Sequence, residues 1–165
     1  MKILDFFRRA RQELPQAPAD EGELADWSIV SAVNRETGEA AVFRVRFDKP
    51  RRDDLCTLTT AIVIRWPYET GDQMPPEPVN AAQLAFEEAL DPMSSSATSE
   101  LVHVSTGMGE KEWIYYARDR DEFMSLLNEL LAEHPAYPLE IEFYEDPEWQ
   151  VWADMVASIR KRTAE

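Results

Sequence analysis

The sequence is poor in cysteine, histidine and glycine, and it has about half as many basic as acidic residues. Its single cysteine, Cys56, cannot form an internal disulfide, and two histidines, His103 and His134, are too few for most zinc sites. No apolar run is long enough to span a membrane, and the first residues lack the pattern of a signal peptide. We therefore expect a cytoplasmic protein with no membrane contact, no metal and no other cofactor.

The shortage of basic residues is concentrated in one part of the chain. The 17 basic and 32 acidic residues give a net charge of -15. Ten of the basic and nine of the acidic residues precede position 53, so the remaining 113 residues carry a net charge of -16. Such a surface repels phosphate backbones and attracts basic proteins. We expect no direct nucleic-acid binding. Two explanations of the negative charge stay open: it keeps the protein soluble, or it binds a basic protein partner.

The chain divides into a short N-terminal part and one domain. Residues 3–14 have apolar side chains at helical spacing, and residues 14–26 are rich in proline, alanine and acid without any period. We predict an N-terminal amphipathic helix and linker over 1–25, followed by a single α+β domain over 26–165.

Within the domain, alternating and helical patterns predict a regular order of elements. We expect a first hairpin, a strand, a helix, a second hairpin, a helix, a strand and a last helix. The first hairpin covers 27–34 and 40–48, the next strand 55–68 and the next helix 80–90. The second hairpin covers 100–106 and 111–119, followed by the helix 119–134, the strand 139–144 and the last helix 147–162. From residue 55 onward this is the split βαβ, or ferredoxin-like, antiparallel arrangement, with an added N-terminal hairpin and terminal helices. Cys56 is expected to be a small core residue.

The alternation in two strands assigns side chains to the faces of this sheet. In the last strand, Leu139, Ile141 and Phe143 are expected to face the helices, which leaves Glu140, Glu142 and Tyr144 on the open face. In strand 111–119, Trp113 and Tyr115 lie on the open face if Ile114 and Tyr116 face the helices. The hairpin, the last helix, a second subunit or a ligand then covers the two aromatic rings. Trp149, near the start of the last helix, is predicted to be buried.

The acidic stretch around residues 140–148 has several readings. Four roles are consistent with these carboxylates. They protect an exposed sheet edge from pairing with another chain, bind a divalent cation, form a catalytic pair, or bind a basic protein. No pattern predicts a catalytic residue, and the spacing is not that of an EF-hand. The candidate partner surface consists of Glu140, Glu142, Tyr144, Glu145, Asp146, Glu148, Trp113 and Tyr115.

One family shares the pattern of the C-terminal part. It consists of an aromatic strand, an Asp-capped helix, a turn with proline and tyrosine, and an acidic strand end before a tryptophan. Here these features are Trp113, Tyr115, Tyr116, Asp119, Phe123, Tyr137, Asp146 and Trp149. The stretch resembles the bacterial family called domain of unknown function 695, well over 110–152 and loosely over 26–155. The resemblance implies a ferredoxin-like α+β fold similar to that of the regulator of ribonuclease E activity B, which acts by binding an enzyme. It implies no catalytic residues.

The functional expectation is a non-catalytic binding or regulatory protein, an inhibitor or immunity-type partner of a basic protein. Two alternatives stay open. One is a carboxylate-based enzyme or divalent-cation site at residues 140–146, and the other is a self-associating domain, such as a homodimer.

Overall fold

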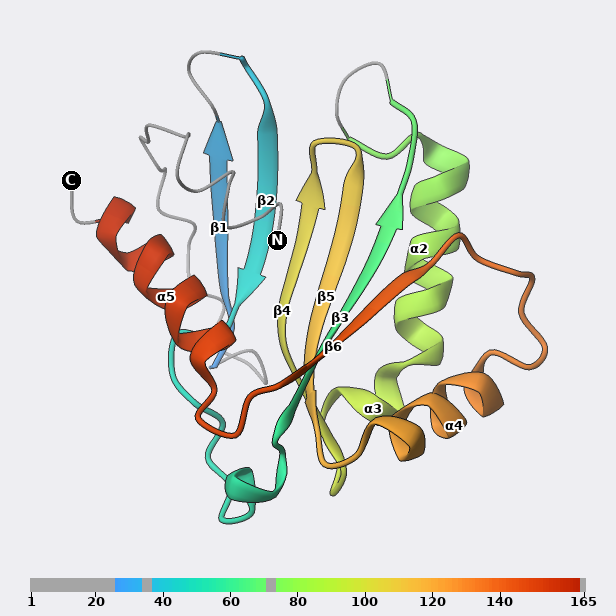
Figure 1. Ribbon diagram of the computed structural model, residues 1–165. Helices are drawn as coiled ribbons and strands as arrows, with labels where there is room; N and C mark the ends of the chain where they lie inside the picture. The colour runs from blue at the N-terminus through green and yellow to red at the C-terminus, as the bar shows by residue number, and fades with distance from the viewer. Residues whose placement is uncertain (1–25, 34–36, 71–73, 164–165) are drawn as a thin grey trace.

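The computed structural model describes residues 26–33, 37–70 and 74–163. The predicted N-terminal helix and almost all of the linker lie outside these ranges. The described elements, in chain order, are β1 Ser28–Val33, β2 Ala40–Val45, η1 Leu55–Thr57, β3 Thr60–Pro67, α2 Glu77–Ala89, α3 Asp91–Ser94, β4 Ser99–Gly107, β5 Glu110–Ala117, α4 Arg120–Leu130, β6 Glu140–Glu145 and α5 Gln150–Thr163 (Figure 1).

The strands form one six-stranded sheet with the order β1-β2-β4-β5-β3-β6, and every neighbouring pair is antiparallel. The α+β class and both predicted hairpins are confirmed. Gly38 has φ 73° in the β1–β2 turn, a conformation that glycine adopts without steric cost. No described helix combines the length and the apolar character needed to cross a bilayer.

Helices cover both faces of the sheet (Figure 1). On the first face, here called the α2 face, helices α2, α3 and α4 enclose a core that includes Ile62, Ile64, Phe86, Met93, Trp113, Tyr115, Phe123 and Leu127. On the second, the α5 face, helix α5 encloses a core that includes Phe43, Val45, Ala61, Val63, Ile114, Tyr116, Met155 and Ile159. Strand β3 is buried on both faces, as its continuous apolar sequence predicts for an inner strand.

The assignment of strand β5 to the two faces was wrong. Trp113 and Tyr115 point to the α2 face and are each 1% exposed, whereas Ile114 and Tyr116 point to the α5 face. The run from Trp113 to Tyr116 is apolar at every position, so its alternation has no recognisable phase. In β6 the polar and apolar residues do alternate, and the predicted packing of Leu139, Ile141 and Phe143 on the α2 face is confirmed.

Helix boundaries differ from the prediction where proline is present. Helix α2 begins at Glu77, three residues before the predicted Asn80, because Pro78 lies in the first turn, where no backbone donor is needed. Helix α5 begins at Gln150 and not at Pro147, which lies in the preceding turn. The predicted cap of α4 is confirmed, because the Glu122 N–H donates to the Asp119 carboxylate at 2.8 Å.

The turn before α5 is anchored by Trp149, which is 2% exposed as predicted. Its indole N–H donates to the Leu58 carbonyl at 2.9 Å, and its ring lies on Tyr116 of β5. Cys56, by contrast, is exposed in η1 and is not the predicted core residue. In this short helix Leu55 packs against the core of the α5 face, and Cys56 is turned away from it.

Candidate functional site

The structure separates the residues that the sequence grouped into one acidic surface. Glu140, Glu142 and Tyr144 share the outer side of β6, and all three are exposed. Glu145 is exposed too, but strand alternation places it on the opposite side, and Glu148 is exposed in the turn before α5. The predicted surface is therefore smaller than expected.

Three members of the predicted surface are buried. Trp113 and Tyr115 belong to the core on the α2 face. Asp146 is 6% exposed, and its carboxylate accepts hydrogen bonds from the Gln150 and Val151 N–H groups at 2.7 and 2.9 Å. The Tyr116 O–H donates to the same carboxylate at 2.5 Å. Asp146 thus caps α5 and is not available to a partner.

Three carboxylates lie within 4.0 Å of one guanidinium on the α5 side of the sheet, and a fourth glutamate is its neighbour on the adjacent strand. We call this group the Arg65 cluster, and it consists of Arg65, Glu110, Glu112, Glu140 and Glu142. Arg65 is 2.9 Å from Glu112, 3.0 Å from Glu142 and 3.9 Å from Glu110. Glu140 lies directly opposite Arg65 in the β3–β6 register. Antiparallel pairing of β5, β3 and β6 brings these residues together, although they are up to 77 positions apart.

Two carboxylates of the Arg65 cluster have pKa values that are shifted in opposite directions. Burial raises the pKa of Glu112 to about 7, although Arg65 opposes the shift. One oxygen of Glu112, Oε1, is buried without a hydrogen-bond donor. The Tyr144 O–H donates to Glu142, and this bond, followed by that from Arg65, lowers the pKa of Glu142. Burial thus favours the protonated form of the inner carboxylate, Glu112, whereas the two hydrogen bonds favour the ionised form of the outer one, Glu142.

The carboxylates at 140–146 do not converge on one point. Glu142 is engaged by Arg65 and Tyr144, Asp146 caps α5, and Glu145 lies on the other side of the strand. No group of three or more His, Cys, Asp or Glu side chains within the described ranges could hold a metal ion. The geometry therefore gives no support to the alternative of a cation site at these positions.

Neither histidine contacts a carboxylate in the described part of the chain. His103 is fully buried in β4 beside Phe43, and burial lowers its pKa to about 3. His134 follows α4, and its Nδ1 lies 2.9 Å from the Tyr137 hydroxyl. Both residues are part of the structure's packing.

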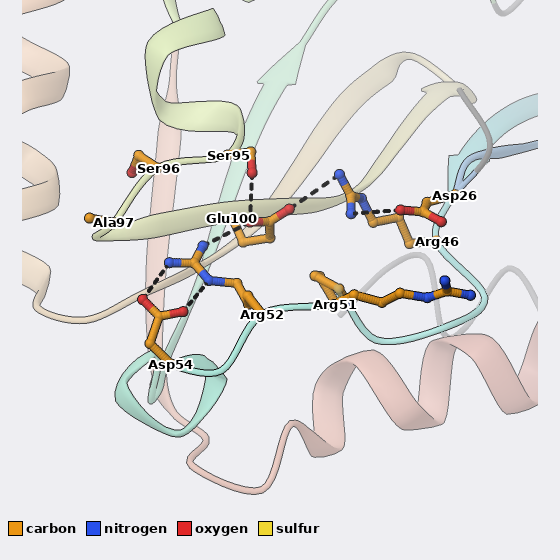
Figure 2. Close-up of a pocket in the computed structure, with 10 residues that line it drawn as sticks. Asp26, Arg46, Arg51, Arg52, Asp54, Ser95, Ser96, Ala97 and Glu100 are labelled. Atoms are coloured by element: carbon orange, nitrogen blue, oxygen red, sulfur yellow. Dashed lines mark hydrogen bonds and ion pairs between the residues drawn. The ribbon is translucent and has the colours of Figure 1, made fainter. Parts of the chain in front are cut away.

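The structure also contains a pocket of about 560 Å³ that the sequence did not indicate (Figure 2). It lies between the β2–β3 connection, the α3–β4 turn and β4. Its lining residues are Asp26, Arg46, Pro50, Arg51, Arg52, Asp54, Ser95, Ser96, Ala97 and Glu100. We call it the arginine pocket. Three arginines in one pocket are notable in a chain with only 17 basic residues.

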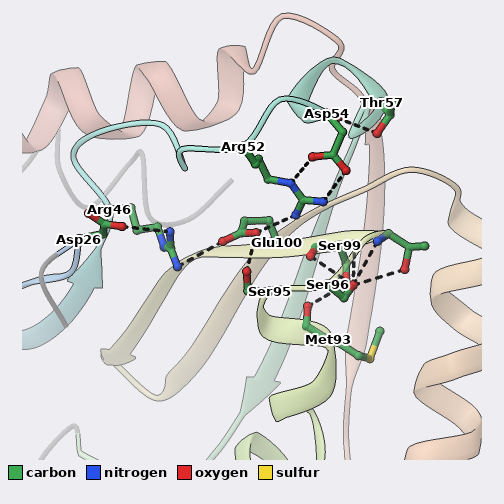
Figure 3. A network of polar contacts seen from close by, with 11 residues as sticks. Asp26, Arg46, Arg52, Asp54, Thr57, Met93, Ser95, Ser96, Ser99 and Glu100 are labelled. Carbon is green, nitrogen blue, oxygen red and sulfur yellow. Dashed lines mark hydrogen bonds and ion pairs between the residues drawn. The ribbon is translucent and has the colours of Figure 1, made fainter. Parts of the chain in front are cut away.

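Glu100 organises this pocket (Figure 3). It is 1% exposed, and its two oxygens lie 3.2 Å from Arg46 and 2.9 Å from Arg52, while Ser95 donates to it at 3.1 Å. Arg52 also forms a bidentate pair with Asp54 at 2.5 and 2.8 Å. These bonds, Asp54 first, raise the pKa of Arg52 still further. The guanidinium groups of Arg46 and Arg52 are therefore fixed in position.

Sequence reasoning missed the arginine pocket because its parts are distant in the chain. Arg46, Arg52 and Glu100 come from segments about 50 residues apart, and no local spacing joins them. The one available signal was that ten of the 17 basic residues precede position 53, although the net charge there is close to zero.

Comparison with known proteins assigns the chain to a family but not to an activity. No curated protein matches the sequence. One family model matches residues 25–156, which includes the whole described sheet and the first half of α5, and its description is a family of unknown function, DUF695. The chain therefore belongs to the DUF695 family.

Proposed function

We propose that the protein is a non-catalytic binding protein that receives a basic protein partner at the Arg65 cluster. The observation that carries the proposal is the group of carboxylates that antiparallel pairing gathers beside Arg65, of which Glu140 and Glu142 are exposed. Among the described residues, Glu140 has no ion-pair partner, although it lies opposite Arg65. A lysine or arginine from a partner supplies the missing positive charge.

Tyr144 gives this surface an aromatic centre. Its side chain is on the same side of β6 as Glu140 and Glu142 and is 38% exposed. An exposed ring beside ionised carboxylates suits a cationic side chain, which packs its alkyl stem on the ring while its head group meets the carboxylates. Glu142 is held in place by Tyr144 and Arg65, so less side-chain freedom is lost on binding.

The fold supports the same class of function by analogy. The order of β3, α2, β4, β5, α4 and β6, with β3 and β5 in the middle of β4-β5-β3-β6, is compatible with the split βαβ arrangement. We propose that this part is ferredoxin-like and similar to the regulator of ribonuclease E activity B. We also propose a bacterial, cytoplasmic setting for it. Fold alone does not determine function, so the binding role depends on the Arg65 cluster.

The experiment is a comparison of partner capture by charge-reversed variants. Tagged wild-type protein, Glu140→Lys and the control Glu133→Lys are expressed in the natural host, and the captured proteins are identified by mass spectrometry. Glu133 is exposed after α4 and lies on none of the strands of the cluster. We expect a basic protein to be captured by the wild type and the control but not by Glu140→Lys.

Kinetic binding of the captured protein then tests the site itself. Glu140→Lys is expected to slow association at low salt, and Tyr144→Ala is expected to speed dissociation. A cation near Glu112 favours its ionised form, so the wild type should bind more tightly at pH 8 than at pH 6, and Glu112→Gln should lose this difference. The proposal is wrong if Glu140→Lys and Glu133→Lys bind the protein equally well.

A second candidate function, self-association, is favoured by strand β1. This edge strand has the sequence SIVSAV, without a charged residue, and Ile29 and Val33 are 55% and 51% exposed. Such an edge is a template for pairing with another copy. Sedimentation should show a dimer that Ser31→Lys, at the centre of the strand, converts to a monomer. A wild-type monomer at high concentration would rule this out.

A further inference from the structure

The arginine pocket has unused hydrogen-bond donors but no unused carboxylate. Glu100 already accepts from Arg46, Arg52 and Ser95, and Asp54 accepts two bonds from Arg52. Asp26 lies 4.0 Å from Arg46. Glu100 and Asp54 are thus occupied by the protein itself, whereas Asp26, with 57% of its side chain exposed, is paired more loosely.

Two donors remain. Within the described residues, Arg51 forms no hydrogen bond or ion pair, and Figure 2 shows its side chain extended along the pocket with no dashed line to the other residues drawn. The Nε of Arg46 is buried and has no acceptor. A buried donor without an acceptor costs free energy, and an oxygen atom of a ligand removes that cost.

We propose that the arginine pocket binds a small molecule through a phosphate or carboxylate group, with Arg51 as the main contact. The planar guanidinium of arginine matches both oxyanions with two parallel hydrogen bonds. A volume of about 560 Å³ is within the usual range for small-molecule sites. Arg46 and Arg52 act as positioning residues, because Glu100 and Asp54 hold them at the wall before any ligand arrives.

The serine turn completes the wall opposite the arginines. Ser96 accepts hydrogen bonds from the Thr98 and Ser99 N–H groups at 3.2 and 3.0 Å, and Ser99 donates to the Met93 carbonyl at 2.7 Å (Figure 3). These bonds fix the turn that follows α3. The pocket is therefore bounded by rigid segments on both sides, which reduces the ordering needed when a ligand binds.

The test uses the full chain and two probes, pyrophosphate for phosphate compounds and succinate for carboxylates. Binding is measured by titration calorimetry, and its place by amide chemical shifts at Arg51 and Ser95–Ala97. We expect one or both probes to bind, and Arg51→Ala to weaken binding by about 10- to 100-fold. Arg51→Lys should recover part of the affinity, because it keeps the charge but not the fork. The control is Arg118→Ala, an exposed arginine of the segment before α4.

Each outcome decides the proposal. Binding of one probe alone identifies the oxyanion class, and binding of both with the predicted loss in Arg51→Ala supports the shared chemistry. If neither probe binds, the proposal is overturned. It is also overturned if Arg118→Ala weakens binding as much as Arg51→Ala does, because the probes then respond only to general surface charge. Circular dichroism of each variant verifies that its fold is intact.

Discussion

Trp149 stacks face to face on Tyr116, with ring centroids 3.9 Å apart and 7° between the ring planes. The pair joins the turn before α5 to the centre of the sheet, and Trp149 keeps a positive φ of 61° within this contact. A left-handed backbone costs a non-glycine residue about 1 kcal/mol or more. The stacking and the bond to the Leu58 carbonyl offset that strain.

Trp149→Ala should therefore lower the free energy of unfolding by about 3 to 5 kcal/mol. The variant keeps the β-carbon and the strained backbone, but it loses the buried ring and its hydrogen bond. Chemical denaturation of the two proteins measures the difference. Trp149→Phe should lose less, because it keeps much of the buried aromatic surface. A midpoint for Trp149→Ala close to that of the wild type would contradict the role of the ring as an anchor.

Asp146→Ala should destabilise the protein by about 2 kcal/mol or more. The substitution removes the cap of α5 and leaves the buried Tyr116 O–H without its acceptor. Denaturation and the helical circular dichroism signal would both report the loss. Its neighbour Glu145 is exposed, so Glu145→Ala is the matched control and should change stability by less than about 0.5 kcal/mol. Equal effects of the two variants would contradict the capping role.

Glu112→Gln should remove a specific part of the pH dependence of stability. In the folded protein the pKa of Glu112 is raised to about 7 from an ordinary value of 4.5. Its contribution is therefore fully present below about pH 4.5 and is lost as the pH rises through 7. The free energy of unfolding of the wild type, minus that of Glu112→Gln, should fall between pH 5 and pH 8 by an amount on the order of 3 kcal/mol.

Glu110→Gln is the control for this measurement, because Glu110 belongs to the same cluster but is farther from Arg65. It should keep most of the pH dependence of the wild type, with a smaller amplitude, because the charge of Glu110 contributes to the raised pKa of Glu112. A difference between wild type and Glu112→Gln that stays constant from pH 5 to pH 8 would show that Glu112 has an ordinary pKa.

The titration of His103 changes the free energy of unfolding in the opposite direction, over part of the same pH range. Within the described part of the chain neither of its ring nitrogens has a hydrogen-bond partner, and burial lowers its pKa to about 3 from 6.5. Its contribution is present above pH 6.5 and is lost as the pH falls toward 3, because the unfolded chain takes up a proton. His103→Phe keeps a ring beside Phe43 without titrating. The free energy of unfolding of His103→Phe, minus that of the wild type, should rise by about 2 kcal/mol as the pH falls from 7 to 5. Thermal melts at both pH values test this.

Patterns that a single element determines were predictable from the sequence. The period of two in EIEFYE assigned both sides of β6, and Asp119 with Glu122 marked the start of α4, because these signals depend only on neighbouring residues. The residues of the strand at Trp113–Tyr116 are all apolar, so polarity did not distinguish the two sides. Only the packing of helices on both faces of the sheet showed which side each residue is on.

The sites depended on pairing between distant segments, which local patterns do not contain. Asp146 looked like one more surface carboxylate, yet the turn after β6 directs it into the start of α5. The Arg65 cluster requires the register of β5, β3 and β6, and the arginine pocket requires a connection to fold back on β4. The prediction that the carboxylates of β6 lie on one exposed side was right for Glu140 and Glu142.

The two edges of the sheet differ in charge, and the difference limits how large an assembly can become. Strand β6 carries three glutamates among six residues, whereas β1 carries no charged residue. Copies that meet at β1 leave only β6 strands facing outward, and these repel one another. In such a dimer both remaining edges would be acidic, which disfavours further growth of the sheet by β6–β6 pairing. The glutamates of β6 are thus expected to oppose edge-to-edge polymerisation of the sheet.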